Sequence, residues 1–167
     1  ATLAYDGRRS EFFRTELMNA LAILNEGHIS PALMKGSWAG AMGQSQFMPS
    51  SFLQYAVDED MDDKKDIWST KADVFASIAN YLKKHGWRQG ERWGRKVLIP
   101  TGFKKELVGL AVRKSVLDWA NLGLVTSDGS TLPKANMMAS VVLPDWKHQT
   151  AFLVYKNFEV ILTYNRS

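Results

Sequence analysis

Residues 35–51 contain the side chains best suited to binding a polar ligand with flat faces. Three glycines and two alanines are interspersed there with larger residues in the run KGSWAGAMGQSQFMPSS. Small residues let the backbone come close to another backbone or to a ligand. Gln44 and Gln46 offer hydrogen bonds, while Trp38, Met42 and Phe47 offer apolar contact surface. A sugar ring would match both kinds of surface, although a tight helix crossing with a turn explains these residues equally well.

The same run resembles the signature of the B-type lytic murein transglycosylases, glycoside hydrolase family 103. These bacterial enzymes cut the glycan strands of peptidoglycan. The similarity extends over nearly the whole chain, through the stretches 2–6, 8–9, 11–17, 55–58, 66–68, 76–82, 85–87, 151–155, 157–158 and 164–165. It implies a lysozyme-like fold and a peptidoglycan lytic transglycosylase activity.

The chemistry that this resemblance implies uses one carboxylic acid instead of the usual pair. The acid protonates the glycosidic oxygen of the MurNAc–GlcNAc β-1,4 bond. Its carboxylate then takes the proton of the muramic acid C6 hydroxyl, which closes a 1,6-anhydro ring. No water attacks, so no second carboxylate is needed to activate one. The acid must stay protonated near neutral pH, which requires a poorly solvated, apolar environment.

The family's catalytic glutamate belongs to a segment that precedes this chain. None of the seven glutamates matches its motif: Glu11, Glu16, Glu26, Glu59, Glu91, Glu106 and Glu159. We therefore expect the acid upstream of Ala1, a chain truncated at both ends, and no activity of this chain alone. It would associate with the missing N-terminal segment and supply most of the substrate cleft. The alternative is a non-catalytic peptidoglycan-binding or structural module.

Seven residues form or line the active site if the resemblance is carried over position by position. Ser37 matches the hydroxyl that holds the catalytic glutamate, and Gln46 matches the amide that reaches the substrate. The other five would line the cleft, namely Met42, Phe47, Tyr81, Tyr164 and Asn165. A structural alternative places Ser37 at a helix cap, Gln46 at the surface and Tyr81 in the core.

A candidate calcium loop follows the signature. Asp58, Asp60, Asp62 and Asp66 place carboxylates at loop positions one, three, five and nine. Asp63 occupies the sixth position, where such loops need glycine, and the twelfth position is Ser69. Some relatives bind calcium here, whereas an acidic surface loop neutralised by neighbouring lysines is the alternative. No cofactor beyond this candidate calcium is expected.

Composition excludes some kinds of site, and the resemblance implies the partner and the compartment. The 167 residues include no cysteine, which excludes disulfides and thiolate metal sites. The net charge of +4 is small and dispersed, so the basic residues are expected mostly on a solvated face and no nucleic acid is expected as a partner. The resemblance implies peptidoglycan glycan strands as the partner. No membrane-length apolar run is present. The resemblance implies a periplasmic protein, attached to the outer membrane only through an N-terminal anchor that this chain lacks.

The predicted helices come first in the chain. They span 10–25, a short stretch from Ser30-Pro31, a segment opened by Pro49, roughly 69–84, and 116–122. Helical spacing predicts two buried stripes, one of Phe13, Leu17, Ala20, Leu21 and Leu24, the other of Val74, Phe75, Ile78 and Leu82. The tryptophans at 38, 68, 87 and 119 are expected mostly in the core, and only Trp38 stands beside a motif.

Strands are predicted near the C-terminus because β-branched and aromatic residues gather there. They span 138–143, 151–155 and 158–164, with a hairpin turn at Lys156-Asn157 and a loop over 143–150. The expected fold is α+β, mainly helical and lysozyme-like, with a small antiparallel β-sheet near the C-terminus. We expect a helical part over 1–95 and a part over 96–167 that completes the cleft, within one continuous domain or lobe.

Overall fold

The chain folds into two compact units, residues 1–84 and 85–167, in a computed structural model that describes residues 2–5, 10–145 and 150–165. The boundary expected at 95/96 falls inside a strand, and the single continuous lobe stays a prediction. The resemblance at Arg8-Arg9 and part of the predicted 143–150 loop lie outside the described residues. No helix of the described part is long and apolar enough to cross a membrane.

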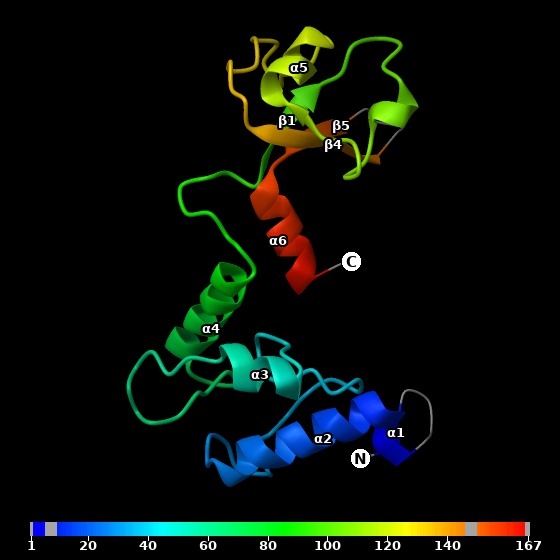
Figure 1. The fold of residues 1–167 in the computed structure, drawn as a ribbon. Helices are drawn as coiled ribbons and strands as arrows, with labels where there is room; N and C mark the ends of the chain where they lie inside the picture. The colour runs from blue at the N-terminus through cyan, green and yellow to red at the C-terminus, as the bar shows by residue number, and fades with distance from the viewer. Residues whose placement is uncertain (1, 6–9, 146–149, 166–167) are drawn as a thin grey trace. The chain divides into compact units, whose positions relative to one another are not determined.

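Four helices build the first unit (Figure 1). They are α1 (Thr2–Tyr5), α2 (Ser10–Asn25), α3 (Pro49–Tyr55) and α4 (Lys71–Lys84). The predictions of α2, α3 and α4 are confirmed, with Pro49 in the first turn of α3 as its fixed φ favours. The short helix predicted at Ser30-Pro31 is wrong. Residues 31–33 form turns instead, closed by the Leu33 and Met34 N–H groups donating to the Ser30 carbonyl.

Both predicted buried stripes of this unit need correction. In α2, Leu21 is 50% exposed, whereas Glu16 and Ile23 are buried. In α4, Phe75 is 69% exposed, and the polar Asp73 and Ser77 are buried beside Val74 instead. Asp73 and Ser77 are buried because they accept backbone N–H groups from the preceding loop, which satisfies their oxygens.

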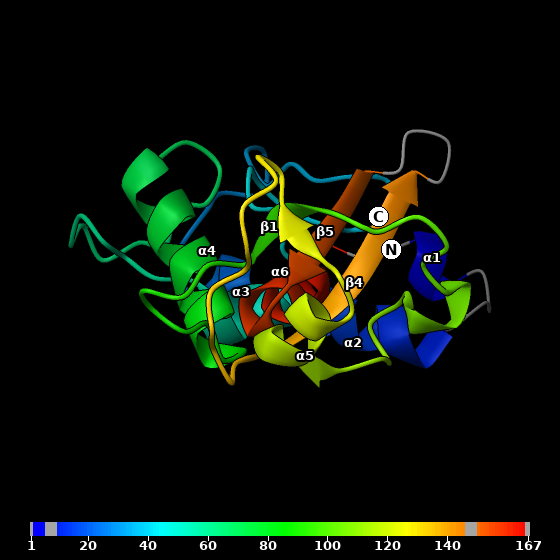
Figure 2. The ribbon, with the colours of Figure 1, turned by 90° about the horizontal axis from the view of Figure 1, so that it is seen from above.

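The second unit is built on a five-stranded antiparallel sheet with the order β2-β4-β5-β1-β3. Figure 2 labels three neighbouring strands of it, β4, β5 and β1. The strands are β1 (Gly94–Leu98), β2 (Lys114–Ser115), β3 (Val125–Thr126), β4 (Met138–Asp145) and β5 (Thr150–Val154). The strands predicted at 138–143 and 151–155 are thereby confirmed as β4 and β5. β1 is not among the predicted strands, because two of its five residues are basic and only two are apolar. It is nevertheless a central strand, and its Val97 is fully buried.

One face of this sheet packs against α5 (Val116–Asn121), which the sequence predicts (Figure 2). Ser115 and Asp118 form a capping box at its start. Trp119 is fully buried among sheet residues, and its indole N–H donates to the Ala139 carbonyl at 2.9 Å. Trp119 is therefore a core tryptophan, as expected. A short 3-10 helix, η1 (Lys105–Leu107), precedes β2.

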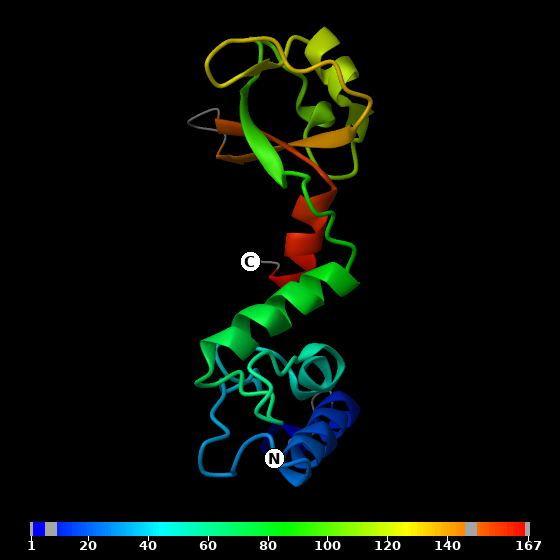
Figure 3. The same ribbon diagram turned by 90° about the vertical axis from the view of Figure 1, so that its left-hand side faces the viewer.

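The strand predicted at 158–164 and its hairpin turn at 156–157 are wrong. Residues 156–164 form a helix, α6 (Lys156–Tyr164), which follows β5 directly (Figure 3). Asn157 is fully buried in its first turn, and Val160 is buried one turn later. The Asn157 side chain accepts the Arg88 N–H at 2.8 Å and donates to the Arg88 and Glu91 carbonyls at 2.9 and 2.8 Å. These tertiary contacts override the strand propensity of Val160 and Ile161.

Candidate functional site

The signature run forms a tightly folded loop between α2 and α3. Isolated antiparallel bridges join Gly36 to Met42 and Met42 to Phe47. The Ser37 N–H donates to the Ala41 carbonyl at 2.7 Å, and the Ser37 hydroxyl accepts the Ala41 N–H at 3.1 Å. These bonds fix the backbone around Ser37, so the loop is stabilised as a small self-bonded unit.

Two glycines of this loop lie where no side chain fits. A β-carbon on Gly36 would lie 2.6 Å from the Ala41 carbonyl oxygen, and one on Gly43 would lie 2.5 Å from the Ile67 carbonyl oxygen. Gly43 also has a φ of +60°, which glycine adopts most readily. Close backbone packing therefore requires glycine at these two positions.

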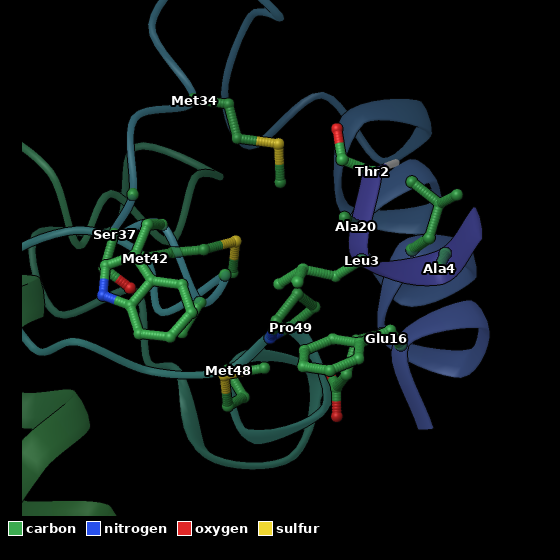
Figure 4. Close-up of a pocket in the computed structure, with 16 residues that line it drawn as sticks. Thr2, Leu3, Ala4, Glu16, Ala20, Met34, Ser37, Met42, Met48 and Pro49 are labelled. Atoms are coloured by element: carbon green, nitrogen blue, oxygen red, sulfur yellow. The ribbon is translucent and has the colours of Figure 1, made fainter. Parts of the chain in front are cut away.

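A cavity of about 320 Å³ opens between the signature loop and the first two helices (Figure 4). On one side it is lined by Thr2, Leu3, Ala4, Phe13, Glu16, Leu17 and Ala20; on the other by Met34, Gly36, Ser37, Trp38, Ala39, Gly40, Met42, Met48 and Pro49. We call it the methionine cavity, because three methionine side chains line it. Ser37 and Met42 are brought together here, and their roles in an active site stay a prediction.

Several residues of the methionine cavity escaped sequence reasoning. Trp38 is 89% exposed at the cavity, which overturns its expected place in the core. Met34 lies outside any motif, and Met48 lies within the signature but was not among the predicted site residues. Glu16 is only 5% exposed, and its position in the middle of an amphipathic helix gave no sign that it would be buried.

Gln46 lies at a different cavity from Ser37. This second cavity, about 460 Å³, is lined by Ile29, Leu33, Lys35, Gly36, Gly43, Gln44, Gln46, Trp68 and Ser69. Gln46 is exposed, has a φ of +51° and donates from its side-chain amide to the Gly43 carbonyl at 2.8 Å. Such a backbone conformation costs of order 1–3 kcal/mol in a residue other than glycine. The two cavities share Gly36, so the signature loop separates them.

Phe47 and Tyr81 pack against each other instead of lining either cavity. Their ring centroids are 5.7 Å apart, and Tyr55 meets Tyr81 edge-on at 4.8 Å. Phe47 is 3% exposed and Tyr81 is half-buried on α4. Tyr164 and Asn165 end α6 in the other compact unit. The role of these residues at the cleft stays a prediction.

The acidic loop gathers three of the four predicted calcium ligands. One carboxylate oxygen of each of Asp58, Asp60 and Asp62 lies within 4.8 Å of the others. Desolvation and the negative charges of neighbouring aspartates raise the pKa of Asp60 above its usual value. Ca²⁺ binds carboxylate oxygens, and its positive charge would offset the repulsion between these aspartates. The three residues therefore fit a calcium ion.

Asp66 is not part of that group, and its role as a fourth ligand stays a prediction. Its carboxylate accepts the backbone N–H groups of Trp68 and Ser69 and the Ser69 hydroxyl, just before α4. Asp73 holds the loop from the other side, accepting the Glu59 N–H at 2.8 Å and the Asp66 N–H at 2.7 Å. Asp66 and Asp73 therefore shape the loop, and their oxygens are occupied by backbone donors.

A protein-family model described as a transglycosylase SLT domain matches residues 1–167, the full length of the sequence. The chain belongs to this family. Its fold class agrees with the prediction, since solved lytic transglycosylase structures superpose on 99% of it. The observed helices and antiparallel sheet are thus the mixed α+β arrangement of this family.

Three relatives define the similarity. SltB3 from Pseudomonas aeruginosa, solved in complex with NAG-anhNAM-pentapeptide, is 48% identical with a TM-score of 0.94, and the chain covers 45% of it. Escherichia coli Slt35, solved in complex with calcium, is 33% identical with a TM-score of 0.80, and 52% of it is covered. Membrane-bound lytic murein transglycosylase B of E. coli K12 is 43% identical over 110 residues, which are 62% of this chain and 30% of that protein. The chain thus spans about half or less of these relatives.

Proposed function

We propose that this protein is a peptidoglycan lytic transglycosylase. It cleaves the MurNAc–GlcNAc β-1,4 bond without water and leaves 1,6-anhydroMurNAc ends. The observation that carries the proposal is the methionine cavity, where the signature loop sets the Ser37 hydroxyl into an apolar wall. A glycan-bound relative at 48% identity supports the same substrate class.

In this proposal the methionine cavity receives the acid and the muramic sugar. Ser37 orients the acid, because it lines the cavity and its hydroxyl, whose oxygen accepts the Ala41 N–H, can donate its own hydrogen to the acid. Met42 and Met48 exclude water from the acid, which keeps it protonated near neutral pH. Gln46 contacts the glycan from the neighbouring cavity, so the strand passes along both sides of the signature loop.

The proton donor comes from a segment outside this chain. Among the described residues that line the methionine cavity, Glu16 alone has a carboxyl group. Both of its oxygens accept hydrogen bonds from Ser50, so it is engaged in holding the fold. We therefore expect the chain alone to be inactive and to associate with the segment that bears the acid.

The experiment compares the full-length protein with residues 1–167 on purified sacculi. Mass spectrometry should find anhydro-muropeptides with the full-length protein and none with the chain alone. Gln46→Ala in the full-length protein should lower turnover by about 10²-fold, since it removes a substrate contact. It should lower the melting temperature only slightly, because the one hydrogen bond that it removes from the fold, to the Gly43 carbonyl, is exposed. Unchanged turnover would remove Gln46 from the site, and release by the chain alone would show that the acid lies within it.

A non-catalytic peptidoglycan-binding module is the second candidate, favoured by the absence of an unengaged carboxyl group among the described lining residues. It predicts binding of full-length protein to sacculi with no anhydro product.

The proposed compartment is the periplasm, with an outer-membrane anchor outside this chain. A calcium ion held by Asp58, Asp60 and Asp62 would stabilise the acidic loop and take no part in the chemistry.

A further inference from the structure

Glu16 is a buried carboxylate in a cavity whose other described lining residues carry no charge. A buried carboxylate without hydrogen-bond partners is strongly destabilising. Here both oxygens bond to one residue: Oε2 accepts the Ser50 N–H at 2.8 Å, and Oε1 accepts the Ser50 hydroxyl at 2.6 Å. Bonds of this length to a carboxylate are charge-assisted and stronger than neutral ones.

Ser50 is the second residue of α3, whose first turn has backbone N–H groups without partners inside the helix. Met48 stands at the N-cap position and makes no side-chain cap. Glu16 supplies that missing acceptor from another helix, α2. The first turn of α3 is therefore held to α2 across 34 residues of sequence.

The residues just before Ser50 form the opposite wall of the methionine cavity. Met48 and Pro49 line it directly, and Figure 4 shows Glu16 beside Pro49. Phe47, one residue earlier, exchanges both backbone hydrogen bonds with Met42, at 2.7 and 3.1 Å. A shift of Ser50 would thus move Met48 and, through Phe47, the Met42 side of the cavity.

We propose that Glu16 is a positioning residue, which sets the width of the methionine cavity by fixing Ser50 and the start of α3. It does not touch the reacting atoms. This inference rests on the proposed function for its kinetic consequence, but its structural consequence is independent of it. Removing the Glu16–Ser50 pair widens the cavity, so the muramic sugar binds less tightly.

The test uses the full-length protein with Glu16→Gln, Ser50→Ala and the double variant. Glu11→Gln is the matched control, because Glu11 lies on the same helix, is exposed and lines no described cavity. We expect Glu16→Gln and Ser50→Ala each to raise KM for glycan strands about three- to tenfold, with a smaller change in kcat. The double variant should raise KM by less than the product of the two single effects, because both substitutions act on one pair, although Ser50→Ala removes the hydroxyl bond and keeps the backbone N–H bond.

A structural readout accompanies the kinetics. Spectra of ¹³C-methyl-labelled methionine report directly on Met34, Met42 and Met48. The Met48 and Met42 signals should shift alike in Glu16→Gln and Ser50→Ala, and stay in place in Glu11→Gln. If Glu16 only stabilises the fold, Glu16→Gln should lower the melting temperature but leave KM unchanged at assay temperatures well below the melting temperature.

The outcomes separate this inference from the proposed function. Unchanged KM in an active Glu16→Gln enzyme, or unmoved methyl signals, would overturn the positioning role and leave the activity standing. Absence of anhydro product from wild-type protein would overturn the proposed function, while the methyl signals would still decide whether Glu16 sets the cavity.

Discussion

Replacing Gly43 with alanine tests whether the signature loop packs as closely as the structure indicates. The new β-carbon would lie 2.5 Å from the Ile67 carbonyl oxygen and 2.8 Å from its Cγ1. That oxygen cannot retreat freely, because it accepts the Gln44 N–H at 2.8 Å. The φ of +60° adds the strain of a left-handed conformation.

Two other glycines separate these two costs. Gly27 has a φ of +80° with nothing within 4 Å of its β-carbon position, so Gly27→Ala should cost only the conformational strain of about 1–2 kcal/mol. Gly36 has no positive φ but would meet the Ala41 oxygen at 2.6 Å, so Gly36→Ala should cost about 1–3 kcal/mol from overpacking. Gly43→Ala combines both and should cost about 2–5 kcal/mol.

The assay is urea unfolding followed by circular dichroism, with thermal melts beside it. At roughly 4–8 °C per kcal/mol for a unit of this size, Gly43→Ala should lower the melting temperature by about 8 °C or more. Gly27→Ala should lower it by about 4–16 °C, and by less than Gly43→Ala in the same assay. A Gly43→Ala protein no less stable than Gly27→Ala would refute the close packing of the loop on Ile67.

Three further outcomes are expected. Asn157→Ala should cost about 3 kcal/mol in urea unfolding, because it leaves the Arg88 N–H and two carbonyls without partners, whereas the exposed Asn121→Ala should change little. Burial raises the pKa of Asp66, but hydrogen bonds from Ser69 and Trp68 outweigh it and hold the pKa below the usual 3.8. The stabilisation from ionised Asp66 is therefore present above about pH 4 and lost as the pH falls through the lowered pKa of the folded state. Asp66→Asn should destabilise the protein at pH 7, and the difference in melting temperature from wild type should narrow near pH 3. Calcium should raise the melting temperature of wild type but not of Asp60→Asn, with Mg²⁺ as the control ion; an equal rise in both proteins would contradict the predicted ligand set.

Local signals in the sequence determined much of the first unit and part of the second. Pro49 opens α3, apolar spacing marks α2 and α4, and Ser115 starts α5, because caps and periodicity act within a few residues. The signature run could also be identified from the sequence alone. Two of its glycines lie where the backbone packs too closely for a larger residue.

Only the tertiary structure decided which partners those elements meet. Residues 158–164 carry strand-forming side chains but fold as helix α6, since the preceding Asn157 is held by backbone groups nearly seventy residues away. Glu16 is buried because Ser50, distant in sequence, satisfies both of its oxygens. Ser37 and Gln46 stand nine positions apart in one motif yet line separate cavities, because the loop folds back on itself between them. Contacts between distant residues are set by packing and hydrogen-bond satisfaction, which no local pattern encodes.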